Sequence, residues 1–212
     1  MNSQLENDLY NCRKMITADW RMQNNWLDRQ TNFVYKCRSL DECFKEIIER
    51  GVDKEYALHR WYNYMTSVAC ENIFCDYGAV HENDIYNHDV DIYINGIPFD
   101  VKLTVYPAKL SEKPFDLETR EGKNEMIRWF YKNQSQQSRK QLLNRLYVVC
   151  DGKSQEECLS IKSNFPLLRK QIKMFMEQSL IYGINEINVV DNGKTYSLKS
   201  DIIFIKYKEN EQ

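Results

Sequence analysis

The sequence predicts an α/β protein with a mixed central sheet flanked by helices. Apolar and polar residues alternate from Val90 to Val105, which is the period of paired, half-buried strands. An apolar run at 146–150 follows a long helical segment, as expected of a crossover into a central strand. These patterns give the element order α, ββ, α, β, α, ββ after an N-terminal helical segment, and this order favours a sheet with helices packed on it.

The composition is that of a single folded unit. With 212 residues, 42% of them hydrophobic and 28% charged, the chain can bury a core, which argues against disorder. No run approaches the roughly 20 apolar residues of a membrane span, and the first residues lack the apolar core of a signal peptide, so we expect a cytoplasmic protein. The seven cysteines include no CxxC pair, which favours reduced thiols over disulfides or a zinc site.

Helix caps divide the chain at about residue 52. Residues 1–52 are expected to form an N-terminal helical extension that packs on the core, with Ser39 capping its last helix and Gly51 ending it. Residues 53–212 are expected to form the core domain. Asp53 can cap a helix that runs to about Cys75.

Turn and cap signals also order the second half of the chain. Residues 123–145 are expected to form one broken helix or two short ones that lead into the strand at 146–150. Ser154 and Glu157 form a capping box, and Pro166 restarts a helix that runs to about Tyr182. A second Asn-Gly pair, at 192–193, joins two closing strands.

The hairpin around Asn95-Gly96 concentrates charge on one face. If these two residues form the loop, cross-strand partners sum to 191, so Asp91 lies opposite Asp100 and Asp89 lies opposite Lys102. All four charged side chains then share one face. The other face is entirely apolar and consists of Val90, Ile92, Ile94, Ile97, Phe99, Val101 and Leu103.

Two facing aspartates require a compensating cation. Like charges directly opposite on a sheet are destabilising, and Lys102 supplies one positive charge. A divalent metal would supply more, and hard carboxylate oxygens suit Mg²⁺ or Mn²⁺. A solvated hairpin face with a surface ion pair is the alternative, but aspartate is a poor strand former and three of them here favour a site.

Residues 88–104 resemble the core motif of the PD-(D/E)xK nuclease superfamily, whose members have the restriction-endonuclease-like fold. Asp91 matches the first acid, and Asp100-Val101-Lys102 matches the (D/E)xK element. The resemblance implies that both acids bind the catalytic metal and that the lysine positions or activates the attacking water. Val90 replaces the proline of the motif, and Asp89 competes with Asp91 for the first ligand position.

The resemblance also implies a further ligand on the helix before the hairpin. Many members of the family carry a glutamate there, and Glu71 stands at the matching place. It shares a helical face with Tyr64 and Val68, so it either points inward as a catalytic metal ligand or is a surface residue near a helix end. A site that uses His81 or His88, as in cap-snatching viral endonucleases, is a further alternative.

A basic segment follows the hairpin. Between residues 121 and 145, six Lys and Arg residues face two glutamates, a local sum of +4 in a chain whose net charge is −2. Such segments contact phosphates, and Lys132, Arg139 and Lys140 are the candidate nucleic-acid-binding residues.

The sequence therefore predicts a nuclease core in residues 53–212 that uses Mg²⁺ or Mn²⁺ to hydrolyse phosphodiester bonds. Glu71, Asp91, Asp100 and Lys102 are its candidate catalytic residues, and the first three are its candidate metal ligands. DNA is favoured over RNA, endonuclease over exonuclease activity, and a homodimer is compatible with duplex cleavage. The alternatives are a non-catalytic nucleic-acid-binding or interaction module and an enzyme of another chemistry, for which the sequence offers no nucleotide loop or nucleophile elbow.

Overall fold

The computed structural model describes residues 3–18, 24–84, 86–110, 115–133 and 142–206, which form an α/β fold with a six-stranded mixed sheet. The helices in these ranges are α1 Ser3–Arg13, α2 Asn25–Gln30, α3 Leu40–Arg50, α4 Lys54–Asp76, α5 Arg120–Asn133, α6 Gln155–Ile161 and α7 Phe165–Tyr182, with 3₁₀ turns η1 Asn32–Lys36 and η2 Ala108–Leu110. The strands are β1 Val80–His81, β2 Ile92–Ile94, β3 Ile97–Val105, β4 Arg145–Asp151, β5 Glu186–Asp191 and β6 Lys194–Lys206.

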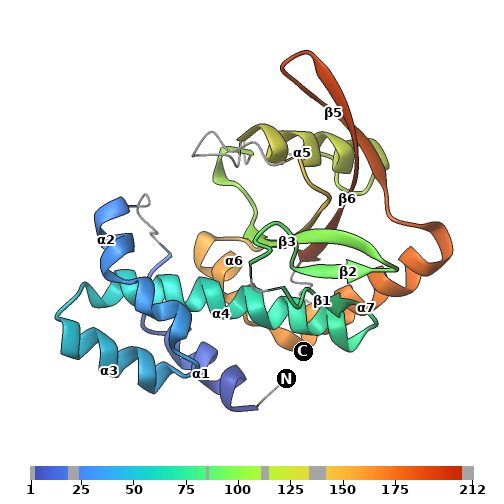
Figure 1. Ribbon diagram of the computed structural model, residues 1–212. Coiled ribbons are helices and arrows are strands. Elements are labelled where there is room, and N and C mark those ends of the chain that lie inside the picture. The colour runs from blue at the N-terminus through green and yellow to red at the C-terminus, as the bar shows by residue number, and fades with distance from the viewer. Residues whose placement is uncertain (1–2, 19–23, 85, 111–114, 134–141, 207–212) are drawn as a thin grey trace.

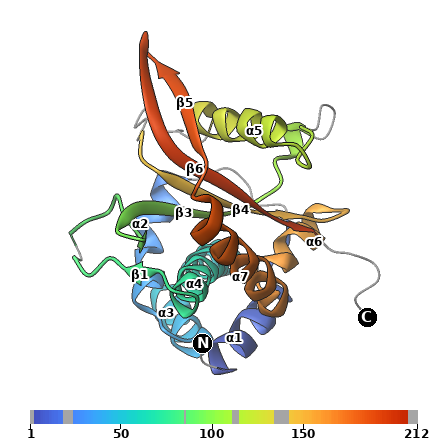
Figure 2. The ribbon, with the colours of Figure 1, turned by 90° about the vertical axis from the view of Figure 1, so that its right-hand side faces the viewer.

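The strands lie in the order β1-β2-β3-β4-β6-β5. The pairs β3–β4 and β4–β6 are parallel, and the outer pairs are antiparallel. Helices α4 and α7 cover one face of the sheet, and α5 covers the other, as Figures 1 and 2 show. The parallel crossover predicted between the hairpin and the strand at 146–150 is confirmed.

Most of the predicted caps and turns are present. The Ser39 Oγ accepts a hydrogen bond from Glu42 N at the start of α3, and Gly51 ends this helix with a φ of 60°. Asp53 caps α4 through Tyr56 N. Ser154 caps α6.

Both Asn-Gly pairs form tight hairpins. Asn95 and Gly96 have φ values of 51° and 77°, and Asn192 and Gly193 have values of 48° and 75°. Positive φ at both loop positions is the geometry that matches the right-handed twist of the flanking strands. The first turn sets the register in which Ile94 pairs with Ile97.

The first helices share one apolar core with α4. Leu9 and Cys12 of α1, Phe33 and Val34 of η1, and Ile47 of α3 belong to the same buried cluster as α4, α7 and the strands they cover. α4 has buried residues around most of its circumference, from Trp61 to Phe74, because helices pack on it from one side and the sheet from the other.

The second face of the sheet is covered by α5. Met126, Ile127, Phe130 and Tyr131 of this helix pack on strand residues such as Tyr147, whose ring stacks on Phe130 with centroids 4.6 Å apart. The helix begins three residues before the predicted start at Lys123 and its described part ends at Asn133. The prediction continued this helical region to residue 145. Residues 134–141 lie outside the described residues, but 142–144 are not helical and Arg145 begins β4, so the predicted end is wrong.

Among the described residues, no helix has the length and apolar character needed to cross a lipid bilayer.

Gly122 allows α5 to pack against the loop that precedes it. A Cβ at this position would overlap the carbonyl oxygen of Asp116, and backbone cannot move aside as a flexible side chain can. We predict that Gly122→Ala lowers the free energy of unfolding by about 1–3 kcal/mol. Alanine is the better helix former by about 1 kcal/mol, so propensity alone predicts the opposite sign.

Urea unfolding followed by circular dichroism measures this difference. Glu125→Ala, at an exposed position of the same helix, is the matched control and should be neutral or slightly stabilising. A Gly122→Ala protein as stable as this control would contradict the close packing of α5 on Asp116.

Candidate active site

The hairpin register changes at the residue that carries the first predicted acid. Ile92 pairs with Phe99, yet the Phe99 carbonyl oxygen also accepts a hydrogen bond from Asp91 N at 2.9 Å. Two residues facing one is the pattern of a β-bulge. The prediction that Asp91 lies directly opposite Asp100 in an unbroken ladder is therefore wrong.

The same change removes Asp89 from the hairpin. β2 begins at Ile92, and Asp89 is an exposed loop residue whose N–H donates to Asn87 Oδ1. Its predicted position opposite Lys102 is wrong, and Val90 is half-buried rather than part of the core. The remaining predicted apolar residues of the hairpin do belong to, or pack against, the buried cluster under α4.

Beyond the bulge, the Asp91 carboxylate accepts a backbone hydrogen bond that a paired strand would otherwise accept. Its Oδ2 accepts a hydrogen bond from Val101 N at 2.7 Å, so it satisfies a backbone donor of β3 that has no partner in β2. Burial raises the pKa of Asp91, and the nearby Asp100 carboxylate also raises it while Lys102 lowers it. The two predicted acids thus lie close together although their backbones are out of register.

Asp100 is buried between two cations. Only 6% of the residue is exposed, and its Oδ2 accepts a hydrogen bond from Arg145 Nε at 2.7 Å. Its Oδ1 pairs with the Lys102 ammonium. Such a buried carboxylate requires paired charge, because desolvation of an isolated ion is costly.

Arg145 reaches Asp100 because the two residues are partners in the parallel β3–β4 ladder. Its side chain is 11% exposed, and the guanidinium lies 5.6 Å from the centroid of the Tyr131 ring on α5. Arg145 was counted in the charge of the predicted basic segment, but the structure places it in a buried ion pair. Its one signal in the sequence is a charged residue at the start of an apolar strand.

Asn144 forms hydrogen bonds to two strands at this end of the sheet. Its carbonyl oxygen accepts from Asp100 N at 3.0 Å, and its side chain donates to Pro98 O and accepts from Lys199 N. The residue before β4 therefore connects the start of β3 to the part of β6 where its pairing with β4 begins. Sequence analysis missed this role, since an asparagine before a strand is also an ordinary loop residue.

Glu71 approaches the cluster from α4. Its pKa is raised to about 8, chiefly by burial and then by the Asp91 charge, while Lys102 lowers it and Asp100 raises it. Of the two orientations that the sequence left open, the structure shows the inward one, since Glu71, Tyr64 and Val68 are half-buried and the Asp91 and Asp100 charges act on Glu71. No hydrogen-bond donor to its carboxyl group is found among the described residues.

The other candidates lie elsewhere. His81 Nε2 bonds to Asn72 Oδ1 at 3.0 Å in the edge strand, and His88 is exposed. Lys132 is exposed on the last turn of α5, one residue after Tyr131, whose ring lies near the Arg145 guanidinium. Arg139 and Lys140 lie outside the described residues.

The donor set suits a hard cation, but the side chains are arranged around protein cations. Within the described residues, no group of three or more His, Cys, Asp or Glu side chains is positioned to hold a metal ion. Lys102 and Arg145 each engage one oxygen of Asp100, and Val101 N engages one of Asp91. Glu71 and one Asp91 oxygen remain available, so the residues fit Mg²⁺ if Lys102 leaves Asp100.

Comparisons with known proteins give no relative: no family model, no curated protein and no solved structure matches this chain.

The Asp100–Arg145 pair is expected to contribute strongly to stability. Replacing one partner leaves the other as a poorly compensated buried charge, so Arg145→Met should lower the free energy of unfolding by about 3 kcal/mol. The double variant Arg145→Met with Asp100→Asn should recover much of this loss. Urea unfolding of the single and double variants measures the coupling.

The matched control is the surface pair of Arg128 and Glu121, whose side chains are 44% and 70% exposed. We expect a coupling below about 1 kcal/mol for the pair Arg128→Met and Glu121→Gln. Equal couplings for the two pairs would show that Asp100 and Arg145 are not a buried pair.

The raised pKa of Glu71 predicts that the stability of the protein depends on pH. The folded protein retains the Glu71 proton up to a pKa of about 8, whereas the unfolded chain releases it near the ordinary value of 4.5. The free energy of unfolding therefore falls as pH rises from about 4.5 to 8, because the folded state binds more protons. Glu71→Gln removes this loss. The free energy of unfolding of the variant relative to wild type should therefore be roughly 2 kcal/mol greater at pH 8 than at pH 5.

Thermal unfolding in EDTA across this pH range tests the prediction. Glu125→Gln, an exposed residue on α5, should follow the wild-type curve. If Glu71→Gln and wild type show parallel stability curves between pH 5 and 8, the Glu71 carboxyl is not held in a proton-retaining environment.

Proposed function

We propose that this protein is a metal-dependent nuclease that hydrolyses phosphodiester bonds, with DNA favoured over RNA and endonuclease over exonuclease activity. The observation that carries the proposal is the convergence of Glu71, Asp91 and Asp100 beside Lys102 at the end of one hairpin. The Asp91 and Asp100 charges raise the pKa of Glu71, and the Asp100 charge also raises the pKa of Asp91, which is an unfavourable arrangement unless a cation or a function maintains it.

The order of elements supports the same proposal. Helix α4, the antiparallel strands β1 to β3, the crossover helix α5 and the parallel strand β4 follow one another as the restriction-endonuclease-like fold requires. We therefore propose this fold for the residues from 53 onwards, together with the PD-(D/E)xK arrangement of Asp91, Asp100 and Lys102.

In the proposed mechanism, Asp91, Glu71 and the Asp100 oxygen that pairs with Lys102 would hold Mg²⁺ or Mn²⁺. When bound, the metal would supply Lewis acidity toward the scissile phosphate and the attacking water. Arg145 keeps the other Asp100 oxygen in its ion pair with β4. Glu71 must lose its proton to act as a ligand, and a cation beside it favours that loss.

Lys102 has a separate part in the reaction. Its side chain is 42% exposed, so the ammonium can leave Asp100 and reach a bound phosphate. There it orients the nucleophile or stabilises the negative charge that develops on the phosphate oxygens. Lys132 lies at the end of α5 that is next to Arg145, from which it can contact a neighbouring phosphate of the substrate.

The test is cleavage of labelled DNA and RNA, single-stranded and duplex, with Mg²⁺ or Mn²⁺ and with EDTA. We expect metal-dependent products with wild type, and a loss of roughly 100-fold or more in Asp100→Asn and in Lys102→Met. Lys194→Met, at the exposed tip of the other hairpin, is the matched control and should cleave as wild type does.

Wild-type rates in Lys102→Met, or products that persist in EDTA, would contradict the proposed mechanism. Circular dichroism and urea unfolding of each variant separate loss of activity from loss of folding, which matters for Asp100→Asn because it leaves Arg145 without its buried partner.

One observation favours a second candidate, a nucleic-acid-binding module without turnover. Both oxygens of Asp100 are engaged by protein cations, which neutralises the cluster without a metal. Such a module would bind nucleic acid equally well in EDTA and in Mg²⁺ and would release no products. A gel-shift assay under both conditions distinguishes it from the nuclease.

A further inference from the structure

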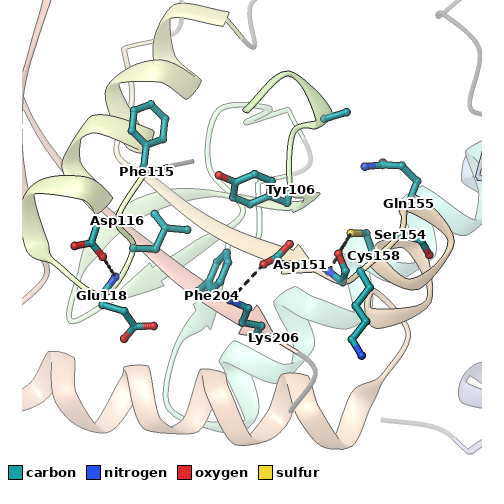
Figure 3. A pocket seen from close by; sticks show the side chains of 14 residues that line it. Tyr106, Phe115, Asp116, Glu118, Asp151, Ser154, Gln155, Cys158, Phe204 and Lys206 are labelled. Carbon is teal, nitrogen blue, oxygen red and sulfur yellow. Dashed lines mark hydrogen bonds and ion pairs between the residues drawn. The ribbon is translucent and has the colours of Figure 1, made fainter. Parts of the chain in front are cut away.

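A second polar site lies at the opposite end of the parallel strands. A hollow of about 600 Å³ opens where β3, β4 and β6 end, as Figure 3 shows. Tyr106 follows β3 directly and stands six residues beyond Asp100, which is roughly 20 Å along an extended strand. The crevice beyond the carboxyl ends of parallel strands is a common location for ligands, and this volume lies in their size range.

The hollow has closely packed walls. Of the seven glycines, five have positive φ and open space around the missing Cβ. Of the other two, Gly152 lines the hollow, and Gly122 lies against Asp116, which also lines it. Gly122 packs against the carbonyl of Asp116, and a Cβ on Gly152 would lie 2.7 Å from the Glu157 side chain and 2.9 Å from Cys158 N. Close backbone packing of both loops indicates that the hollow exists before any ligand binds.

A carboxylate with little compensation lies on the floor. Asp151 ends the central strand β4 and is half-buried, and burial raises its pKa. Among the described residues no donor forms a hydrogen bond with its carboxylate, and its ion pair with Lys206 Nζ spans 4.0 Å. By contrast, the Asp100 carboxylate at the start of β3 is held at 2.7 Å by Arg145.

Aromatic rings border the same carboxylate. Tyr106 and Phe204 meet edge to face with centroids 6.3 Å apart, and Figure 3 shows Asp151 beside both rings. The ammonium of Lys206 lies 5.8 Å from the Phe204 ring centroid as well as 4.0 Å from Asp151. The Lys206 ammonium, itself an alkylammonium group, therefore already lies near both a carboxylate and an aromatic ring, a combination that binds organic cations.

The charge balance of the lining points the same way. Among the described residues that line the hollow, Asp116, Glu118 and Asp151 oppose Lys153 and Lys206, which leaves a net charge of −1. An anionic ligand would meet this excess of carboxylates, whereas a cation would compensate it. Lys206 is 63% exposed, so its side chain can swing out into solvent and give up its place.

We propose that this hollow binds an organic cation, an alkylammonium or a guanidinium group, whose N–H groups donate to Asp151 while its charge lies against Tyr106 and Phe204. Lys206 competes with the ligand from within the chain. The group can belong to a small diffusible amine or to a lysine or arginine side chain of a peptide. This site does not depend on the nuclease proposal, because it uses none of the same residues.

Isothermal titration of the full-length protein tests the proposal with agmatine and spermidine as free amines and with a short arginine-containing peptide. We expect saturable binding of at least one probe. Asp151→Asn should weaken it about tenfold or more, because a charge-assisted hydrogen bond is lost. Lys206→Met should instead tighten it several-fold, because the internal competitor is removed while the floor is intact.

The relative affinities of the free amines and the peptide distinguish the two sources of the group. Asp41→Asn, an exposed change on α3, is the matched control and should leave binding unchanged. Three results would overturn the proposal: no saturable binding of any probe, binding that Asp151→Asn leaves intact, or binding of inorganic phosphate in preference to the amines. The opposite effects of the Asp151 and Lys206 variants cannot arise from a general loss of folding.

Discussion

The ion pair between Asp100 and Arg145 constrains this end of the sheet more than any other contact. Both side chains are almost fully buried, and each would be costly to desolvate alone. Their backbones are partners in the parallel β3–β4 ladder, so the pair joins the hairpin to the central strand. With one Asp100 oxygen fixed in this way, only the other can exchange Lys102 for a different cation. The stability of the sheet and the chemistry of the site therefore share one carboxylate.

Local features of the fold could be predicted from the sequence because their causes lie within a few residues. Asn95 and Gly96 are two adjacent residues that tolerate positive φ. The Ser39 hydroxyl accepts a hydrogen bond from the N–H of Glu42, only three residues further along the chain. The alternation of the hairpin correctly separated Phe99, Val101 and Leu103 from Asp100 and Lys102. Glu71 was predicted from the family resemblance, and helical spacing added only that it shares a face with Tyr64 and Val68.

Features that depend on contacts distant in sequence could not be predicted in this way. The register of a hairpin follows from its turn, but the bulge at Asp91 forms because β2 stops pairing while β3 continues beside β4. The partner of Asp100 stands 45 residues further along, across a crossover whose length does not determine a parallel register. Arg145 and Asn144 were therefore missed as site residues, although both contact the predicted hairpin.

The two ends of the parallel strands hold their carboxylates in different ways, and this difference has a consequence for binding. Asp100 has strong protein partners, so a cation that binds there must first displace Lys102, and its affinity is reduced by the free energy of that ion pair. Asp151 has only a long contact with an exposed lysine, so a ligand displaces little. The proposed site at Asp100 would therefore suit a divalent ion, whose contacts bring a large gain in binding free energy. The proposed site at Asp151 would suit a singly charged group, which could not break a short ion pair.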